Sequence, residues 1–229
     1  MLHGTSDVHE DAVQIPLQKD ALDADRMIPA GAYGLVIFAH GSGSSRKSER
    51  NRAVAEALGS GGLATLLLDL LTRKEERIDI VTRQHRFDID LLATRLVSAI
   101  EWARQDARTA KLPIGLFGAS TGAAAALVAA AAMPNDVAAV VSRGGRPDLA
   151  GTALARVQAP TLLVVGGNDL EVLGVNKAAQ RQLHSDVRLE IVPGASHLFE
   201  EPGTLERVAK LALDWFNTHL AGAGAHARA

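Results

Sequence analysis

The chain has 229 residues, of which 47% are hydrophobic and 22% are charged, a mixture typical of one globular domain. Its 24 Lys and Arg side chains nearly balance 26 Asp and Glu side chains, and the formal net charge of −2 argues against nucleic acid as a main partner. Because the chain has no cysteine, disulfides, thiolate metal sites and a cysteine nucleophile are excluded.

The N-terminal stretch MLHGTSDVHEDAV lacks the basic and apolar regions of a signal peptide. The longest apolar run, Ala123–Met133, is too short to span a bilayer. We therefore expect a cytoplasmic protein that has no membrane partner and is a monomer or a homodimer. Residues 12–220 are predicted to form one domain, with flexible tails at residues 1–11 and 221–229.

Short apolar runs alternate with helical patterns along the chain. The apolar runs predict strands at Val13–Leu17, Ala24–Pro29, Gly34–Ala39, Ala64–Leu70, Ile114–Phe117, Val137–Ser142, Thr161–Val165 and Val187–Val192. The helical patterns predict helices at Asn51–Leu58, Phe87–Asp106, Ala123–Ala132, Asp148–Ala155, Val172–Leu183 and Gly203–Leu220. The charged segment Thr72–Arg86 fits a surface loop with a short helix.

This alternation predicts an α/β fold with a mostly parallel central sheet that is covered by helices on both faces. The first two strands are expected to form an antiparallel pair at one edge. Only Arg143–Pro160 separate two of the later strands, which leaves room for one short helix but not for a lid domain.

The stretch Leu112–Ala132 (LPIGLFGASTGAAAALVAAAA) combines an apolar strand, a sharp turn and an Ala-rich helix. The turn Gly118–Gly122 matches G-x-S-x-G, a strained strand-to-helix turn that exposes a serine hydroxyl. The free N–H groups of the helix start would meet negative charge that develops there. The motif can also arise by chance, but its strand and helix context favours Ser120 as a nucleophile.

A serine hydroxyl needs a base, and the base needs an acid that orients it. In parallel sheets such groups gather at the carboxyl ends of the strands. Asp169 follows one predicted strand and His197 follows the next, so the chain order is Ser, Asp, His. We expect His197 to move the proton of Ser120 and Asp169 to orient the ring of His197.

The loop His40–Ser45 follows another buried strand and is rich in glycine and serine. We expect the Ser42 and Thr121 N–H groups to form an oxyanion hole, with His40 positioning the loop beside the substrate. A phosphate-binding loop is the competing interpretation, but the loop lacks G-K-[ST], and Arg46 stands where a G-x-G-x-x-G motif has its last glycine.

Three arginines lie near these strand ends, namely Arg46, Arg143 and Arg146. A guanidinium group can bind a carboxylate through two parallel hydrogen bonds, so one or more of them could bind an acidic substrate. The alternative is that they are surface charges or pair with Asp148 and Glu49.

Seven segments together carry a family resemblance. They are FAHGSGSSR, RNRAVAEAL, LLLDLLT, GLFGASTGAAAAL, VVSRGGRPDLA, LLVVGGND and GASHLFEEPGTLERVAKLALDWF. In this order they resemble the α/β-hydrolase superfamily, and within it the small dienelactone hydrolase-like branch, from about Val13 to Leu220. The resemblance implies a lidless hydrolase with Ser120, Asp169 and His197 as its triad. Dienelactone hydrolases have cysteine where this chain has serine, which favours ordinary ester chemistry over dienelactone.

The resulting expectation is a serine hydrolase that cleaves small to medium soluble esters through an acyl-enzyme, without a cofactor or a metal ion. Two alternatives remain open. One is a non-catalytic scaffold that binds a small molecule or a protein. The other is an acyltransferase or thioesterase with the same triad, because the acyl acceptor enters only after acylation.

Overall fold

The computed structural model describes residues 8–221. The strands are β1 (Val8–Pro16), β2 (Ala21–Pro29), β3 (Leu35–Ala39), β4 (Ala64–Leu68), β5 (Ile114–Ala119), β6 (Val137–Arg143), β7 (Thr161–Gly166) and β8 (Val187–Val192). The helices are α1 (Glu49–Ser60), α2 (Arg73–Thr82), α3 (Ile89–Gln105), α4 (Thr121–Ala132), the 3₁₀ segment η1 (Pro147–Arg156), α5 (Leu170–Gln180) and α6 (Thr204–Leu220). Within this part of the chain no helix is both long enough and apolar enough to cross a lipid bilayer.

One sheet contains all of these strands, in the order β1-β2-β4-β3-β5-β6-β7-β8. The pairs β1/β2 and β2/β4 are antiparallel, and all other neighbouring pairs are parallel. Every residue of β3, β4, β5 and β7 is buried, because parallel strands have helices on both faces. The predicted fold class is confirmed.

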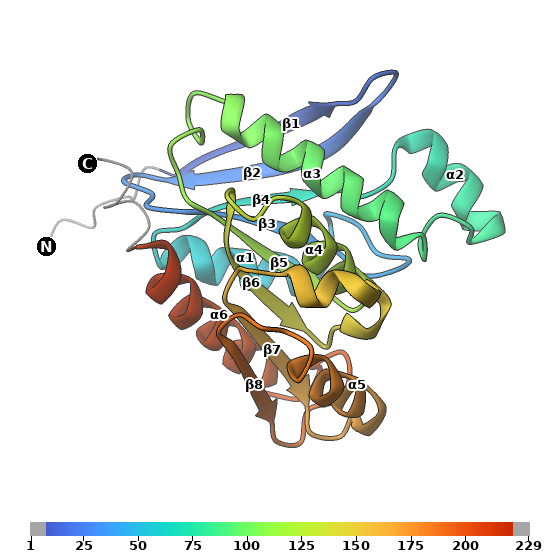
Figure 1. Cartoon of the computed structure of the whole chain (residues 1–229). Coiled ribbons are helices and arrows are strands. Elements are labelled where there is room, and N and C mark those ends of the chain that lie inside the picture. Colours follow the sequence, from blue (N-terminus) through green and yellow to red (C-terminus); the bar gives the residue numbers. More distant parts are fainter. Residues whose placement is uncertain (1–7, 222–229) are drawn as a thin grey trace, which may run out of the picture.

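Two hydrophobic layers enclose the sheet (Figure 1). On one face α3, α4, η1 and α5 contribute apolar side chains such as Leu96 and Leu154, and on the other α1 and α6 contribute Leu58 and Phe216. Helix α4 lies at the centre and is built largely of buried alanines, which allow it to approach the sheet closely. Between β6 and β7 the chain forms only η1, so no lid domain is inserted there.

The first strand is longer than the sequence predicted. It begins at Val8, which pairs with Pro29, so the boundary at Val13 was wrong and residues 8–11 belong to the sheet. Asp11 accepts hydrogen bonds from Nε and Nη2 of the buried Arg26 at 2.9 and 2.7 Å. Because the residues of this ion pair are far apart in the chain, the sequence near Asp11 looks as polar as a flexible tail although it forms a strand. The rest of the predicted tails, residues 1–7 and 222–229, lies outside the described residues.

The charged segment forms a well-defined helix, α2, which projects away from the sheet (Figure 1). A capping box starts it, because Thr72 accepts from the Glu75 N–H and the Glu75 carboxylate accepts from the Thr72 N–H. Beyond the helix, the buried Asp79 carboxylate accepts from the backbone N–H groups of His85 and Arg86. These local hydrogen bonds explain why so polar a segment is ordered.

Candidate active site

Ser120 lies at the turn between β5 and α4 with φ 52° and ψ −121°, a conformation that is rare for a residue with a side chain. The flanking glycines make this turn possible. A Cβ at Gly118 would lie 2.4 Å from the Ala123 Cα, and one at Gly122 would lie 2.4 Å from the backbone oxygens of Ala39 and His40. The structure therefore has the strained, tightly packed turn that exposes a serine hydroxyl in hydrolases.

Asp169 and His197 meet at the same edge of the sheet, although 28 residues separate them in the chain. Asp169 follows β7, His197 follows β8, and the His197 Nδ1 lies 2.6 Å from the Asp169 Oδ2. The Asp169 side chain is 13% exposed and that of His197 is 39% exposed. This contact fixes one ring nitrogen of His197 and leaves Nε2 available for proton transfer.

The backbone after β6 links Ser120 to His197. The Ser120 N–H donates to the Arg143 carbonyl at 3.2 Å, and a Cβ on the next residue, Gly144, would lie 3.6 Å from the His197 Cε1. Ser120 and the imidazole therefore flank the same short segment. Within residues 8–221 no hydrogen bond joins the Ser120 hydroxyl to the imidazole. Hydrolases commonly hold this contact loosely until substrate binds.

Two backbone N–H groups near Ser120 in the fold belong to Ser42 and Thr121. Gly41 packs against the turn, because a Cβ there would lie 3.2 Å from the Ser120 Cβ, and Ser42 follows it. Thr121 is the first residue of α4, where backbone N–H groups lack intrahelical acceptors. Among the described residues, neither the Ser42 N–H nor the Thr121 N–H has a hydrogen-bond acceptor. Both are therefore available to an oxyanion.

His40 is buried beneath this loop, with 9% of its surface exposed. Its Nδ1 lies 2.9 Å from the Gly41 carbonyl, and its Nε2 accepts the Leu70 N–H at 3.1 Å. A carbonyl can only accept, so the ring is neutral with its proton on Nδ1. These contacts tie the loop to the end of β4, a positioning arrangement rather than contact with a substrate.

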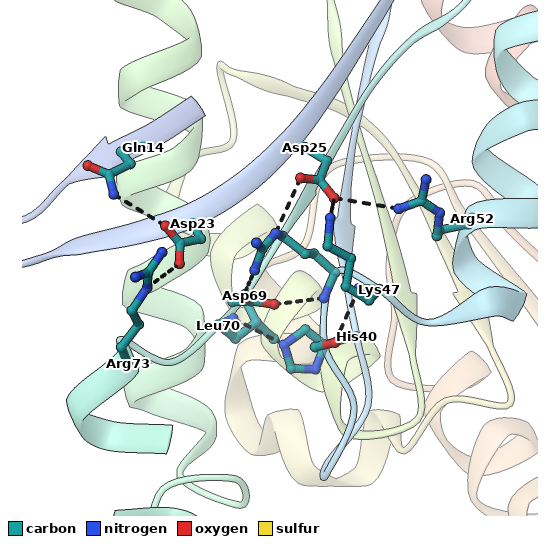
Figure 2. Close-up of polar contacts among 11 residues, drawn as sticks. Gln14, Asp23, Asp25, His40, Lys47, Arg52, Asp69, Leu70 and Arg73 are labelled. Carbon is teal, nitrogen blue, oxygen red and sulfur yellow. Dashed lines mark hydrogen bonds and ion pairs between the residues drawn. The ribbon is translucent and has the colours of Figure 1, made fainter. Parts of the chain in front are cut away.

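Arg46 belongs to the same supporting network, whose carboxylates Asp25 and Asp69 are shown with His40 in Figure 2. Its backbone N–H donates to the Asp69 Oδ1 at 2.8 Å, its Nη1 pairs with the Asp69 Oδ2, and its Nε lies 3.3 Å from the Asp25 Oδ1. Asp25 also pairs with Lys47 and Arg52. The expected role of Arg46 in substrate binding is therefore not supported, since its guanidinium is neutralised by carboxylates other than the suggested Glu49.

The two arginines at the end of β6 and in the loop after it differ sharply in their surroundings. Arg146 is bound by Asp148 through three hydrogen bonds, the shortest of 2.7 Å, so it corresponds to the paired surface charge considered from the sequence. Arg143 is 7% exposed, and its Nε and Nη1 are buried without a hydrogen-bond partner among the described residues. Sequence reasoning missed Arg50, because only the fold places this α1 residue close enough to lower the pKa of Arg143.

No group of three or more His, Asp or Glu side chains within residues 8–221 is arranged to hold a metal ion. The polar groups of the site are instead the hydroxyl of Ser120, the His197–Asp169 pair and the backbone donors of Ser42 and Thr121. Such a set can deliver a nucleophile, move a proton and stabilise an oxyanion.

The buried His40 predicts a pH-dependent stability. Burial lowers the pKa of His40, because the charged ring would lose its contact with water. Protonation would also place a second N–H against the Leu70 N–H. The contribution of His40 to the free energy of unfolding is thus complete above the ordinary histidine pKa of about 6.5 and is lost as the pH falls toward the lower folded value. The loss has a slope of up to about 1.4 kcal/mol per pH unit.

Urea unfolding between pH 7.5 and pH 5 measures this slope. The His40→Gln variant is expected to lose stability more gradually on acidification than the wild type. The exposed His184 provides a matched control, and His184→Gln should leave the slope unchanged. Parallel slopes for wild type and His40→Gln would contradict the assignment.

Comparison with known proteins shows the family of the chain. The family described as "Alpha/beta hydrolase domain" matches residues 32–219. A dienelactone hydrolase from Anabaena variabilis is 58% identical, with a TM-score of 0.92 over 93% of this chain and 99% of that chain. Est1E from Butyrivibrio proteoclasticus is 18% identical, with a TM-score of 0.75 over 92% of this chain and 99% of that one, a likeness of fold alone.

A curated protein from Mycobacterium tuberculosis, named "Putative phosphoribosyl transferase", is 60% identical over 197 residues. The match covers 86% of this chain but only 44% of that relative, so the chain spans less than half the length of the curated proteins that it matches. The matched family covers most of the chain and the identity to the Anabaena variabilis enzyme extends over nearly all of it. The chain therefore belongs to the α/β-hydrolase family and is dienelactone hydrolase-like.

Proposed function

We propose that this chain is a serine hydrolase that cleaves carboxylic esters of small to medium soluble substrates through an acyl-enzyme. The observation that carries the proposal is the 2.6 Å contact between His197 Nδ1 and Asp169 Oδ2 at the sheet edge where Ser120 occupies its strained turn. The identity of 58% to a dienelactone hydrolase supports hydrolysis of an ester-type bond.

In the first half of the reaction, the Ser120 Oγ attacks the carbonyl carbon while its proton passes to the His197 Nε2. The carbonyl oxygen becomes an oxyanion, which the Ser42 and Thr121 N–H groups stabilise. When the tetrahedral intermediate collapses, the alcohol leaves with the proton from His197. Asp169 stabilises the transient imidazolium and keeps Nδ1 protonated.

Water completes the cycle. It gives a proton to His197 as its oxygen attacks the acyl carbon, and the second tetrahedral intermediate releases the acid and returns the proton to Ser120. A thiol or alcohol acceptor could replace water at this point, so transfer to another acceptor uses the same residues. We favour hydrolysis because the His197 side chain is 39% exposed to solvent and only η1 lies between β6 and β7.

The curated relatives carry a name that refers to phosphoribosyl transfer. It was given to proteins of which the match covers 44%, and no observation on this chain favours phosphoribosyl transfer. The glycine-rich loop that could have bound phosphate instead packs its Gly41 against the Ser120 turn.

A covalent probe tests the proposal most directly. A fluorophosphonate should phosphonylate the protein once, and peptide mass spectrometry should locate the adduct on Ser120. The protein should also hydrolyse 4-nitrophenyl esters of short acyl chains, and prior labelling should abolish that activity. An unreacted Ser120 together with ligand-induced thermal stabilisation would instead favour a non-catalytic binding scaffold.

A further inference from the structure

The most unusual side chain outside the proposed triad is that of Arg143, the last residue of β6. Alternation along the strand places it on the same face as Ala139 and Val141, which pack with α1 and α6. The residue is 7% exposed, and its Nε and Nη1 are buried without a hydrogen-bond partner in the part of the chain that the structure describes. No ion pair of Arg143 with a carboxylate is found among the described residues.

A second buried arginine, Arg26, differs from Arg143 because carboxylates pair with it. Arg26 is 2% exposed, yet Asp11 and Asp106 both pair with its guanidinium, at 2.7 and 2.9 Å. A buried cation without such partners is costly, because it loses water and gains nothing in exchange. A fold that retains this cost at one position commonly does so for function rather than for stability.

A second guanidinium adds to the positive charge. Arg50, in the first turn of α1, lies close enough that its charge, together with the larger effect of burial, lowers the pKa of Arg143 to about 10. Arg143 therefore stays charged at neutral pH. Among residues 8–221, Arg50 itself has only a long contact with Glu200, 3.4 Å from Nη1 to Oε1, and its Nε is buried without a partner there.

The backbone of Arg143 adjoins the proposed nucleophile, and Arg50 contacts the segment after His197 through Glu200. The Arg143 carbonyl accepts the Ser120 N–H at 3.2 Å, and the Arg50 partner Glu200 lies three residues after His197 in the chain. Arg50 follows the loop that carries Ser42. The two arginines thus belong to segments that adjoin the oxyanion loop, the Ser120 turn and the loop that carries His197.

We propose that Arg143, assisted by Arg50, binds an acidic group of the substrate, a carboxylate or a phosphate, while the ester carbonyl of that substrate lies at Ser120. The inference rests on the proposed function and adds the substrate class to it. A guanidinium forms charge-assisted hydrogen bonds with such a group, and the bound anion neutralises the otherwise unpaired charge.

Three 4-nitrophenyl esters of equal chain length test the proposal. Their far ends carry a methyl ester, a carboxylate or a phosphate monoester. Wild type should prefer one or both acidic esters in kcat/KM, and the better of the two identifies the acidic group. In Arg143→Met the ratio of acidic to neutral kcat/KM should fall about 10- to 100-fold, the effect of losing hydrogen bonds to a charged group. Arg50→Gln should lower this ratio less than Arg143→Met does. The ratio for Arg143→Lys should lie between those of wild type and Arg143→Met.

Arg188 supplies the matched control, because its exposed side chain pairs with Glu190 near the opposite end of the sheet. Arg188→Gln should leave the ratio unchanged. The melting temperature of Arg143→Met should equal or exceed that of wild type, since the variant removes an unpaired buried charge. A ratio unaffected by Arg143→Met, or a loss that is equal for all three esters, would overturn the proposal.

Direct binding separates this inference from the hydrolase assignment. Calorimetry with inorganic phosphate and with monomethyl adipate should show binding of at least one of them to wild type and to Ser120→Ala, and much weaker binding to Arg143→Met. If no ester is hydrolysed but this difference is found, the anion site stands and the proposed function fails. Equal binding by wild type and Arg143→Met, or binding of neither anion, would refute the anion site even if neutral esters are hydrolysed.

Discussion

Ser120→Ala is expected to abolish ester hydrolysis, with a fall in kcat of about 10⁴-fold or more, because no other group in the site replaces the attacking oxygen. The fold should be preserved. The Ser120 side chain makes no capping hydrogen bond to α4, and alanine has the same Cβ, so the strain at φ 52° is unchanged. Hydrolysis of 4-nitrophenyl esters and the melting temperature measure the two effects.

Ser142→Ala is the matched control for this substitution. Ser142 lies in β6 at the same end of the sheet, and its buried hydroxyl has no hydrogen-bond partner in the described structure. Its removal should cost little stability or activity. Wild-type turnover by Ser120→Ala would show that the serine is not the nucleophile, and the triad assignment would have to be abandoned.

Asp169→Asn is expected to lower kcat by about 10⁴-fold, although its shape is nearly unchanged. The asparagine amide can donate to the His197 Nδ1, which moves the ring proton to Nε2. A protonated Nε2 cannot accept the proton of Ser120. Because Asp169 precedes α5 without a side-chain capping bond and asparagine is an equally good residue there, the helix should remain intact.

Steady-state kinetics at neutral pH measures this loss. The exposed Asp214, which pairs with Lys210 on α6, offers a control, and Asp214→Asn should behave as wild type. A reduction of less than tenfold in Asp169→Asn would show that the 2.6 Å contact with His197 does not set the tautomer of the ring.

The overall fold could be predicted because its signals are local. Continuous apolar runs such as β3 and β7 are buried on both faces of the sheet, and their hydropathy alone distinguishes them from amphipathic strands. The strand β8 was predicted with the same bounds, Val187–Val192. The turn at Ser120 could also be predicted from the sequence, because glycines are required at positions 118 and 122, where the helix and strand backbones are in contact.

Other features depended on partners far away in the chain. Residues 8–11 are polar, and only pairing with β2 and the ion pair with Arg26 make them a strand. The capping box and the buried Asp79 order α2, but the net polarity of that segment resembles a loop. In each case long-range or specific hydrogen bonds outweighed the average composition.

The amino-acid sequence by itself determined the sheet, its helices and the three strand ends on which Ser120, Asp169 and His197 lie, because periodic hydrophobicity decides what is buried. Which arginines are paired with carboxylates was decided only by the tertiary structure. Arg46 and Arg146 have carboxylate neighbours, whereas Arg143 is buried without one. Pairing of charges depends on which side chains are in contact in the folded structure, and the hydropathy of the sequence does not predict those contacts.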